Sequence, residues 1–278
     1  MFKRRRVICD YPGHVVMGDL LEFPDEGFDR QNMKDGKIYT KILLLVDCFS
    51  KRVWARGLTR KTGEECANAL ISIFDSMMSP PTMFVTDDGR GKSDICVLNL
   101  IEKEFFNSSV QEVMNEYGVN HFKTPTKTAW KASLAERAIR TIKSRLWRWF
   151  QRSKKNRWID VLDSFIENYN ETPHSSIGMA PNDVTDKNRD VVYKRLFPDD
   201  GVKIDCKHKI GDLVRVKIEK ELEKKFFKGY TPNWSEEIYV ITSKIQSQGV
   251  CWYKLSDQSG KLQKGIYYSE QLNLVSRK

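Results

Sequence analysis

The sequence predicts an α/β domain followed by a small all-β domain. Between residue 15 and residue 150, short apolar runs alternate with stretches in which apolar residues recur every three or four positions. Alternation of strands and helices is typical of α/β architectures. Beyond residue 200 only short β-type runs remain, and five of them within about 70 residues indicate a small barrel. The length of 278 residues is sufficient for two domains.

The elements of the α/β domain follow from local patterns. Apolar clusters bounded by polar residues predict strands at 15–23, 41–50, 51–58, 82–86 and 119–123. Helical spacing of apolar residues predicts helices at 62–78, 104–117 and 133–150. Thr62 is the expected N-cap of the first helix, because Glu64 and Glu65 follow it in the first turn.

The all-β domain follows a break at Pro198–Gly201. Short apolar runs predict its strands at 213–218, 238–242, 250–255, 265–268 and 272–275. The predicted organisation is therefore a basic arm over residues 1–14, the α/β domain over 15–198 and the all-β domain over 199–278. The arm carries Lys-Arg-Arg-Arg at residues 3–6.

Composition favours a polyanionic partner and excludes two classes of protein. Lys and Arg number 47 against 37 Asp and Glu, a net charge of +10, which favours nucleic acid binding. No apolar run approaches the roughly 18 residues of a membrane span, and no apolar segment follows the basic start as in a secretory signal.

The six cysteines include no CxxC pair. In the absence of a secretory signal they are interpreted as reduced thiols of an intracellular protein. Cys206 and His208 are expected at the surface in preference to a shared metal site.

Three acidic residues stand out by their position. Asp19 lies within a predicted strand, where a charge is costly unless it is partnered or binds a metal. Asp87 ends a strand, where ligand sites of α/β sheets collect, and Glu136 lies in the first turns of the long helix. Each alone has a structural reading, as an edge-strand residue, a turn residue and a helix-dipole partner. Together they have the chemistry of a divalent-metal site.

Motifs along nearly the whole chain carry a family resemblance. They are Gly18-Asp19-Leu20, Val46-Asp47-Cys48-Phe49-Ser50-Lys51, Thr86-Asp87-Asp88-Gly89, Lys131-Ala132-Ser133-Leu134-Ala135-Glu136-Arg137, Tyr169-Asn170-Glu171-Thr172-Pro173-His174-Ser175-Ser176, Gly178-Met179-Ala180-Pro181 and Phe227-Lys228-Gly229-Tyr230-Thr231-Pro232-Asn233-Trp234. In this set and order the sequence resembles the retroviral-type DDE integrases, and most of all the Polinton/Maverick (virophage-related) transposon integrases.

The resemblance implies an RNase H-like catalytic core, with a mixed five-stranded sheet flanked by helices, followed by an SH3-like DNA-binding barrel. It implies that Asp19, Asp87 and Glu136 are the catalytic, metal-binding triad. The implied cofactor is Mg²⁺, two ions per active site, with Mn²⁺ as a substitute. Asp88 is the weaker choice of ligand, and Asp47 is expected to be structural.

Two features depart from the family pattern. Forty-eight residues separate Asp87 from Glu136, more than in retroviral enzymes, which fits an insertion within 90–103 beside the active site. Loops tolerate such insertions, so the triad is expected to survive, and Arg90 and Lys92 are candidates for DNA contact. The His/His/Cys/Cys zinc module of the family has no counterpart, so the protein lacks it or the chain is truncated.

Basic residues indicate where DNA binds. Residues 137–157 hold nine Lys or Arg and no Asp or Glu. Such a run is usually a solvated face, but Arg140 and Lys143 lie one and two turns beyond Glu136, on the same side of the helix. Phosphate contact is therefore favoured. The predicted DNA contacts are Arg137, Arg140, Lys143, Lys131 and Lys127 in the core, and Lys220, Lys224, Lys225 and Lys228 in the barrel.

The predicted function is that of a mobile-element DNA integrase. Such an enzyme carries out 3′-end processing and strand transfer on double-stranded DNA, works as a homo-oligomer in the nucleus of a host cell, and needs neither a membrane nor a small-molecule substrate. One alternative is a catalytically inactive, domesticated integrase that serves as a DNA or chromatin scaffold. Another is a plain RNase H-like nuclease.

Overall fold

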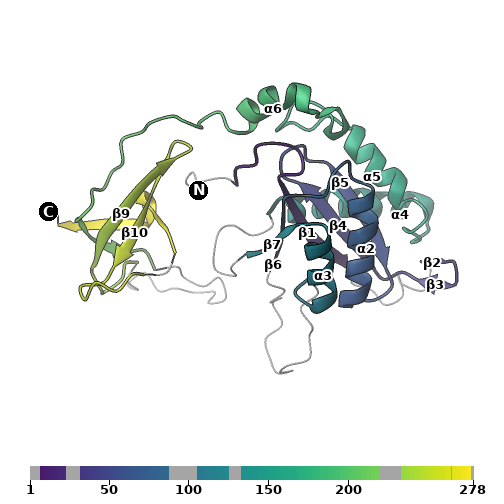
Figure 1. Cartoon of the computed structure of the whole chain (residues 1–278), viewed down its shortest axis with the longest axis horizontal. Coiled ribbons are helices and arrows are strands. Elements are labelled where there is room, and N and C mark those ends of the chain that lie inside the picture. The colour runs from purple at the N-terminus through teal and green to yellow at the C-terminus, as the bar shows by residue number, and fades with distance from the viewer. Residues whose placement is uncertain are drawn as a thin grey trace. The chain divides into compact units, whose positions relative to one another are not determined.

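The structure is a computed structural model that describes residues 7–22, 32–87, 105–124, 133–218, 233–263 and 265–276. The side chains of residues 87, 123, 124 and 133–136 lie outside that description. The chain divides into two compact units, with Val7–Leu196 in one and Phe197–Lys278 in the other. Each unit has its own sheet (Figure 1).

The first unit is built on a mixed sheet of five strands in the order β5-β4-β1-β6-β7. β1 pairs antiparallel with β4, and β4 pairs antiparallel with β5. β6 runs parallel to both β1 and β7. All five strands predicted from apolar patterning are present, as β1 (Val15–Glu22), β4 (Lys41–Asp47), β5 (Val53–Leu58), β6 (Met83–Asp87) and β7 (Asn120–Thr124).

The three predicted helices are also present, as α2 (Gly63–Asp75), α3 (Ser108–Glu116) and α4 (Ser133–Ser153). The Thr62 side chain accepts a hydrogen bond from the Glu65 amide, which confirms Thr62 as the N-cap of α2. α3 begins later than predicted because the Asn107 side chain caps it, accepting from the Val110 amide at 3.0 Å. The preceding Phe105 is buried in the core instead of continuing the helix.

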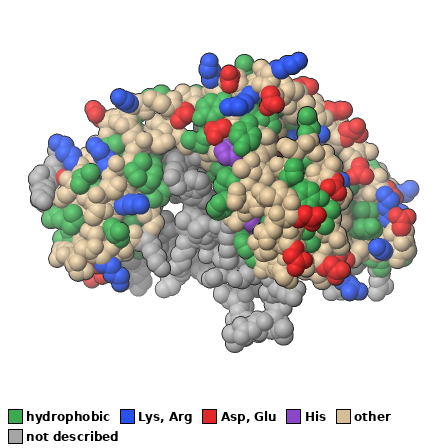
Figure 2. Space-filling view, viewed as in Figure 1, with side chains coloured by type: hydrophobic (Ala, Val, Ile, Leu, Met, Phe, Trp, Pro, Cys, Tyr) green, Lys and Arg blue, Asp and Glu red, His purple; other side chains and the backbone are tan. Residues whose placement is uncertain are grey.

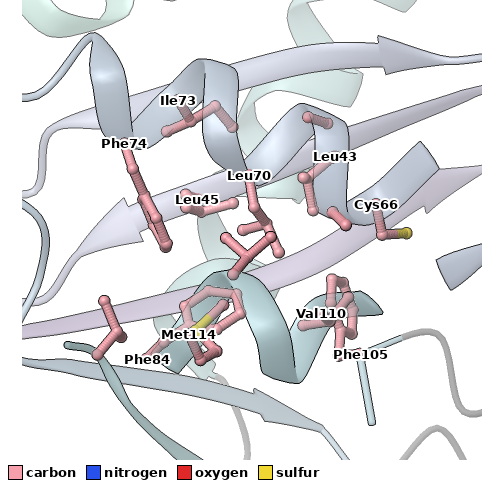
Figure 3. Packing of buried hydrophobic residues seen from close by; sticks show 14 of the residues in the cluster. Leu43, Leu45, Cys66, Leu70, Ile73, Phe74, Phe84, Phe105, Val110 and Met114 are labelled. Carbon is pink, nitrogen blue, oxygen red and sulfur yellow. The ribbon is translucent and has the colours of Figure 1, made fainter. Parts of the chain in front are cut away.

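α2 and α3 cover one face of the sheet (Figure 1). They bury a cluster that includes Val16, Leu43, Leu45 and Phe84 from the strands (Figure 3). Because side chains alternate along a strand, the buried residues between these positions face the other way. α4 packs against β1 and β4, and therefore covers the opposite face, with its buried residues Ala138, Ile142, Leu146 and Phe150.

Several short elements had no sequence prediction. They are the hairpin β2 (Met33–Lys34) and β3 (Lys37–Ile38), the helices α5 (Leu162–Glu171) and α6 (Arg189–Leu196), and the 3₁₀ turns η1 (Pro181–Asp183) and η2 (Asp186–Asn188). α5 is attached to the edge of the sheet by the buried Asn170. Its side chain accepts from the Val53 amide and donates to the Val53 carbonyl, both at 2.8 Å. Asn170 thus pairs with β5 as a neighbouring strand would.

The second unit contains a five-stranded sheet in the order β11-β10-β9-β8-β12, and every described pairing in it is antiparallel. Its strands are β8 (Leu213–Val216), β9 (Tyr239–Ser247), β10 (Val250–Ser256), β11 (Tyr267–Tyr268) and β12 (Leu272–Ser276), with the 3₁₀ turn η3 (Ser269–Gln271) before β12. The five predicted strands are therefore present. Closure of the sheet into an SH3-like barrel stays a prediction.

The interpretation of all six cysteines as reduced thiols is wrong for two of them. Cys206 forms a disulfide with Cys251, 45 residues away, with 5.6 Å between their Cα atoms. The fold of the second unit brings the two residues together, which spacing in the sequence does not reveal. The bond also removes Cys206 as a metal ligand. Cys9, Cys48 and Cys66 are free and buried.

His208 is not at the surface as predicted. Only 1% of it is exposed, and its ring packs edge-to-face against the Tyr253 ring, with 5.5 Å between ring centroids. Its position is set by packing within the second unit. Among the helices that the structure describes, none is long and apolar enough to cross a membrane.

Candidate active site

Asp19 lies in the middle of the sheet, on the face that α4 covers. A Cβ atom on the preceding Gly18 would lie 2.5 Å from Phe84 Cζ, so position 18 points into the cluster under α2 and α3. The next residue in a strand points to the opposite face. Asp19 is half-buried there, and its Oδ1 accepts a hydrogen bond from the Leu20 amide at 2.8 Å.

Asp87 is the last residue of β6, the parallel neighbour of β1. The register pairs Gly18 with Thr86, so Asp19 and Asp87 are each the next residue along adjacent strands. Neighbouring strands lie about 4.8 Å apart. The backbone therefore brings two of the three predicted carboxylate residues to neighbouring positions, although 67 residues lie between them in the sequence.

Glu136 lies near the start of α4, the helix that packs against β1 and β4. From the middle of the helix, Lys143 Nζ donates to the Glu22 carbonyl at 3.0 Å, at the last residue of β1. Burial lowers the pKa of Lys51, and the charge of Arg137, near the helix start, lowers it further. Glu136 precedes Lys143 by seven residues, about 10 Å of helix. Asp19 precedes Glu22 by about the same length of strand.

Asp19 and Asp87 thus lie at neighbouring positions on adjacent strands, and Glu136 lies near the start of the helix that packs against β1. Among the side chains that the structure describes, no three His, Cys, Asp or Glu form a group that could hold a metal ion. Asp19 belongs to the described side chains, whereas those of Asp87 and Glu136 do not.

Asp47 has a structural environment. Only 1% of the residue is exposed, and its carboxylate accepts from the amides of Phe49 and Ser50 and from the Ser50 hydroxyl. These bonds fix the turn after β4. Lys51 closes the turn with a left-handed backbone (φ 63°) and donates its Nζ to the Cys48 carbonyl.

The arginines of α4 differ in their surroundings. Arg137 and Arg140 are exposed. Arg145 instead contacts α5, where it donates to Asn168 Oδ1 at 3.4 Å and lies 5.6 Å from the centre of the Tyr169 ring. On the face drawn in Figure 2, Lys and Arg side chains are interspersed with Asp and Glu side chains. Exposure of basic side chains is therefore not specific to Arg137 and Arg140. What sets these two apart is their place close to Glu136 on α4.

Several predicted DNA-contact residues fall outside the described residues. These are Lys127, Lys131, Lys220, Lys224, Lys225 and Lys228, together with Arg90 and Lys92 of the predicted insertion. Asp88, the weaker choice of metal ligand, also lies outside the described residues. Of the predicted contacts, the structure therefore describes only Arg137, Arg140 and Lys143.

Comparison with known proteins adds a sequence relative. No protein-family model matches the chain. A transposon-derived protein of Caenorhabditis elegans is 32% identical over 210 residues, covering 76% of this chain and 65% of the relative. The chain thus spans slightly less than two thirds of that relative's length.

Solved structures identify the fold. The chain is similar to a chain in the cryo-EM structure of the simian T-cell lymphotropic virus intasome in complex with PP2A regulatory subunit B56 gamma. The match has a TM-score of 0.58 and 16% sequence identity, and it covers 97% of this chain and 81% of the intasome chain. The fold is that of a retroviral integrase catalytic core. The HTLV-2 integrase catalytic core in complex with magnesium (trimeric form) matches with a TM-score of 0.46 and 17% identity over 63% of this chain and 97% of that one.

The predicted integrase-core fold with its mixed five-stranded sheet is thereby confirmed, as is the presence of an all-β C-terminal sheet. The narrower prediction of a Polinton/Maverick-type integrase stays a prediction.

Proposed function

We propose that the chain is the DNA integrase of a mobile element, of the Polinton/Maverick type, and catalyses metal-dependent 3′-end processing and strand transfer. The observation that carries the proposal is the register of β1 and β6, which makes Asp19 and Asp87 neighbours on adjacent strands beneath α4. The integrase-core fold and the transposon-derived relative support it.

The proposed metal ligands are Asp19, Asp87 and Glu136. Carboxylates are the hard oxygen donors that Mg²⁺ binds in proteins, and Mg²⁺ commonly keeps waters and substrate phosphates as its other ligands. Three carboxylates on a sheet and its covering helix would suit two such ions, which Asp19, Asp87 and Glu136 would hold between them. When bound, Mg²⁺ or Mn²⁺ supplies activation of the attacking oxygen and stabilisation of the leaving oxygen.

The reaction proceeds in two phosphoryl transfers. Water first attacks a phosphorus near the 3′ end of the element DNA, and a short end fragment leaves. The exposed 3′-hydroxyl oxygen of the element then forms a bond to a phosphorus of the target DNA. At the same time the bond between that phosphorus and the 3′ oxygen of the preceding target nucleotide breaks. No covalent protein intermediate forms. The chain contributes orientation of the reacting groups and a fixed arrangement of charge.

The substrate is double-stranded DNA. Arg137, Arg140 and Lys143 of α4 would contact phosphates beside the proposed metal site. Because two element ends are joined to one target, the active form is proposed to be a homo-oligomer, acting in the nucleus of a host cell.

Replacing Arg140 by alanine is expected to weaken DNA binding and to lower the slope of log affinity against log salt by about 0.9, because one phosphate contact is lost. Arg145→Ala is the matched control on the same helix, since Arg145 is engaged with α5. Fluorescence anisotropy over a salt series measures both slopes. Equal slopes for the two variants would exclude Arg140 as a specific phosphate contact.

The test of the function is a joining assay with labelled duplex ends, a target plasmid and Mg²⁺ or Mn²⁺ at low salt. Because the terminal sequence recognised is unknown, a panel of candidate element ends is needed. Joined products from the wild type that disappear in Glu136→Gln would establish the integrase. DNA binding without cleavage or joining by either protein, across the whole panel, would instead favour the inactive scaffold. Cleavage without joining would favour a plain nuclease.

A further inference from the structure

A chain of hydrogen bonds behind the proposed active site ends at the residue before Asp87. Gln111 on α3 lies beside His121 on β7, with 2.9 Å between Gln111 Nε2 and His121 Nδ1. On the other side of the ring, His121 Nε2 lies 3.1 Å from Thr86 Oγ1 on β6. Thr86 is fully buried. Three elements therefore meet at the carboxyl end of β6.

The directions of these bonds follow from the donor groups. The Gln111 amide nitrogen can only donate, so His121 Nδ1 accepts, and the neutral ring carries its proton on Nε2 and donates it to Thr86 Oγ1. Burial lowers the pKa of His121 to about 4, which keeps the ring neutral at physiological pH. The ring is also held by stacking on Phe106, with 4.1 Å between centroids and 14° between planes.

The buried hydroxyl of Thr86 requires a hydrogen-bond partner. Valine has nearly the same shape as threonine and suits a buried strand, whereas a hydroxyl away from water is costly unless it is hydrogen-bonded. Thr86 therefore fits this position because it bonds His121. The register pairs Thr86 with Gly18 on β1, so the chain of bonds acts at the level where Asp87 follows on one strand and Asp19 on the other.

We propose that Gln111, His121 and Thr86 are positioning residues that fix the carboxyl end of β6 and so place Asp87 for metal binding. This inference rests on the proposed function. The clamped His121 ring and the Thr86 hydroxyl restrain the backbone of β6 from the face opposite Asp19. Hydrogen-bonding partners behind metal ligands commonly change metal affinity or activity 10–100-fold when they are removed.

The test compares Thr86→Val, which removes the hydroxyl, with Thr86→Ser, which restores it. Thr86→Val is expected to raise the Mg²⁺ concentration for half-maximal joining by about 10–100-fold, with DNA affinity close to that of the wild type. Its melting temperature is expected to fall, because His121 Nε2 loses its hydrogen-bond acceptor. Thr86→Ser is expected to need nearly the wild-type concentration. If Thr86 served packing alone, Thr86→Val would leave the Mg²⁺ requirement unchanged. A shift that the smaller serine reverses therefore points to the hydroxyl.

His121→Phe is the second variant, because it keeps an aromatic ring on Phe106 and removes both ring nitrogens. It is expected to shift the Mg²⁺ requirement as Thr86→Val does, and the double variant is expected to be no worse than either single variant, since one chain of bonds is broken in each. Additive shifts, or a wild-type Mg²⁺ requirement in both single variants, would overturn the positioning role and leave the proposed function intact.

A wild type that joins no DNA end would instead overturn the proposed function. The positioning role is then decided by Mn²⁺ binding, measured by electron paramagnetic resonance. Weaker binding by Thr86→Val than by Thr86→Ser supports it, and equal binding by the two variants refutes it.

Discussion

Replacing Asp19 by asparagine is expected to lower the rate of DNA joining by about a thousandfold or more, because metal ions supply several kcal/mol of transition-state stabilisation. Asparagine keeps the size of the side chain and an oxygen that can accept from the Leu20 amide, the bond that Asp19 makes in the structure. It removes the negative charge with which Asp19 would hold a metal ion. DNA affinity and thermal stability should therefore change little.

Glu22→Gln is the matched control for this prediction. Glu22 lies on the same strand as Asp19, 46% of its side chain is exposed, and its carboxylate forms a surface ion pair with Lys61 at 3.4 Å. Exposed ion pairs contribute about 0–1 kcal/mol, so the variant should fold and join DNA at nearly the wild-type rate. Single-turnover joining kinetics measure both variants. Joining by Asp19→Asn at the rate of Glu22→Gln would exclude Asp19 as a catalytic metal ligand.

Replacing Asn170 by alanine is expected to lower the free energy of unfolding by about 2–5 kcal/mol, since a buried polar group left without its partner costs about 1–3 kcal/mol. The variant removes two such partners at once, because the Asn170 side chain serves both the amide and the carbonyl of Val53. It also loosens α5 from the sheet edge. Chemical denaturation, followed by circular dichroism, measures the change.

Asn168→Ala is the control on the same helix. Asn168 is exposed, and its side-chain oxygen accepts a long hydrogen bond from Arg145 at 3.4 Å. Surface substitutions of this kind usually change stability by less than about 0.5 kcal/mol. A free energy of unfolding that is the same in Asn170→Ala and Asn168→Ala would show that the paired amide does not stabilise the edge of β5.

The predicted elements are those whose signal is local. β4 is wholly apolar between Ile42 and Val46, and α2 combines a capping threonine with helical spacing, so each could be recognised from neighbouring residues alone. α5 is short, and the side-chain amide of its Asn170 attaches it to β5, a strand more than a hundred residues earlier in the sequence. The disulfide between Cys206 and Cys251 and the burial of His208 likewise depend on contacts that form only in the folded unit.

The same distinction applies to the candidate site. Asp19 and Asp87 could be selected from the sequence because a carboxylate within or at the end of an apolar strand is unusual. Their adjacency follows from the parallel register of β1 and β6, which is a property of the fold. His121 had no sequence signal, because its partners Gln111 and Thr86 lie on two other elements.

The most direct test of the proposed chemistry compares two pre-processed element ends that differ only in the attacking group. One end carries a 3′-hydroxyl and the other a 3′-hydrogen, and both are incubated with the wild-type protein, Mg²⁺ and target DNA. We predict joined product from the hydroxyl end, none from the hydrogen end, and no protein–DNA adduct with either. Joining of the hydrogen end, or a covalent protein–DNA species on the path to product, would contradict direct transfer by the DNA 3′-hydroxyl.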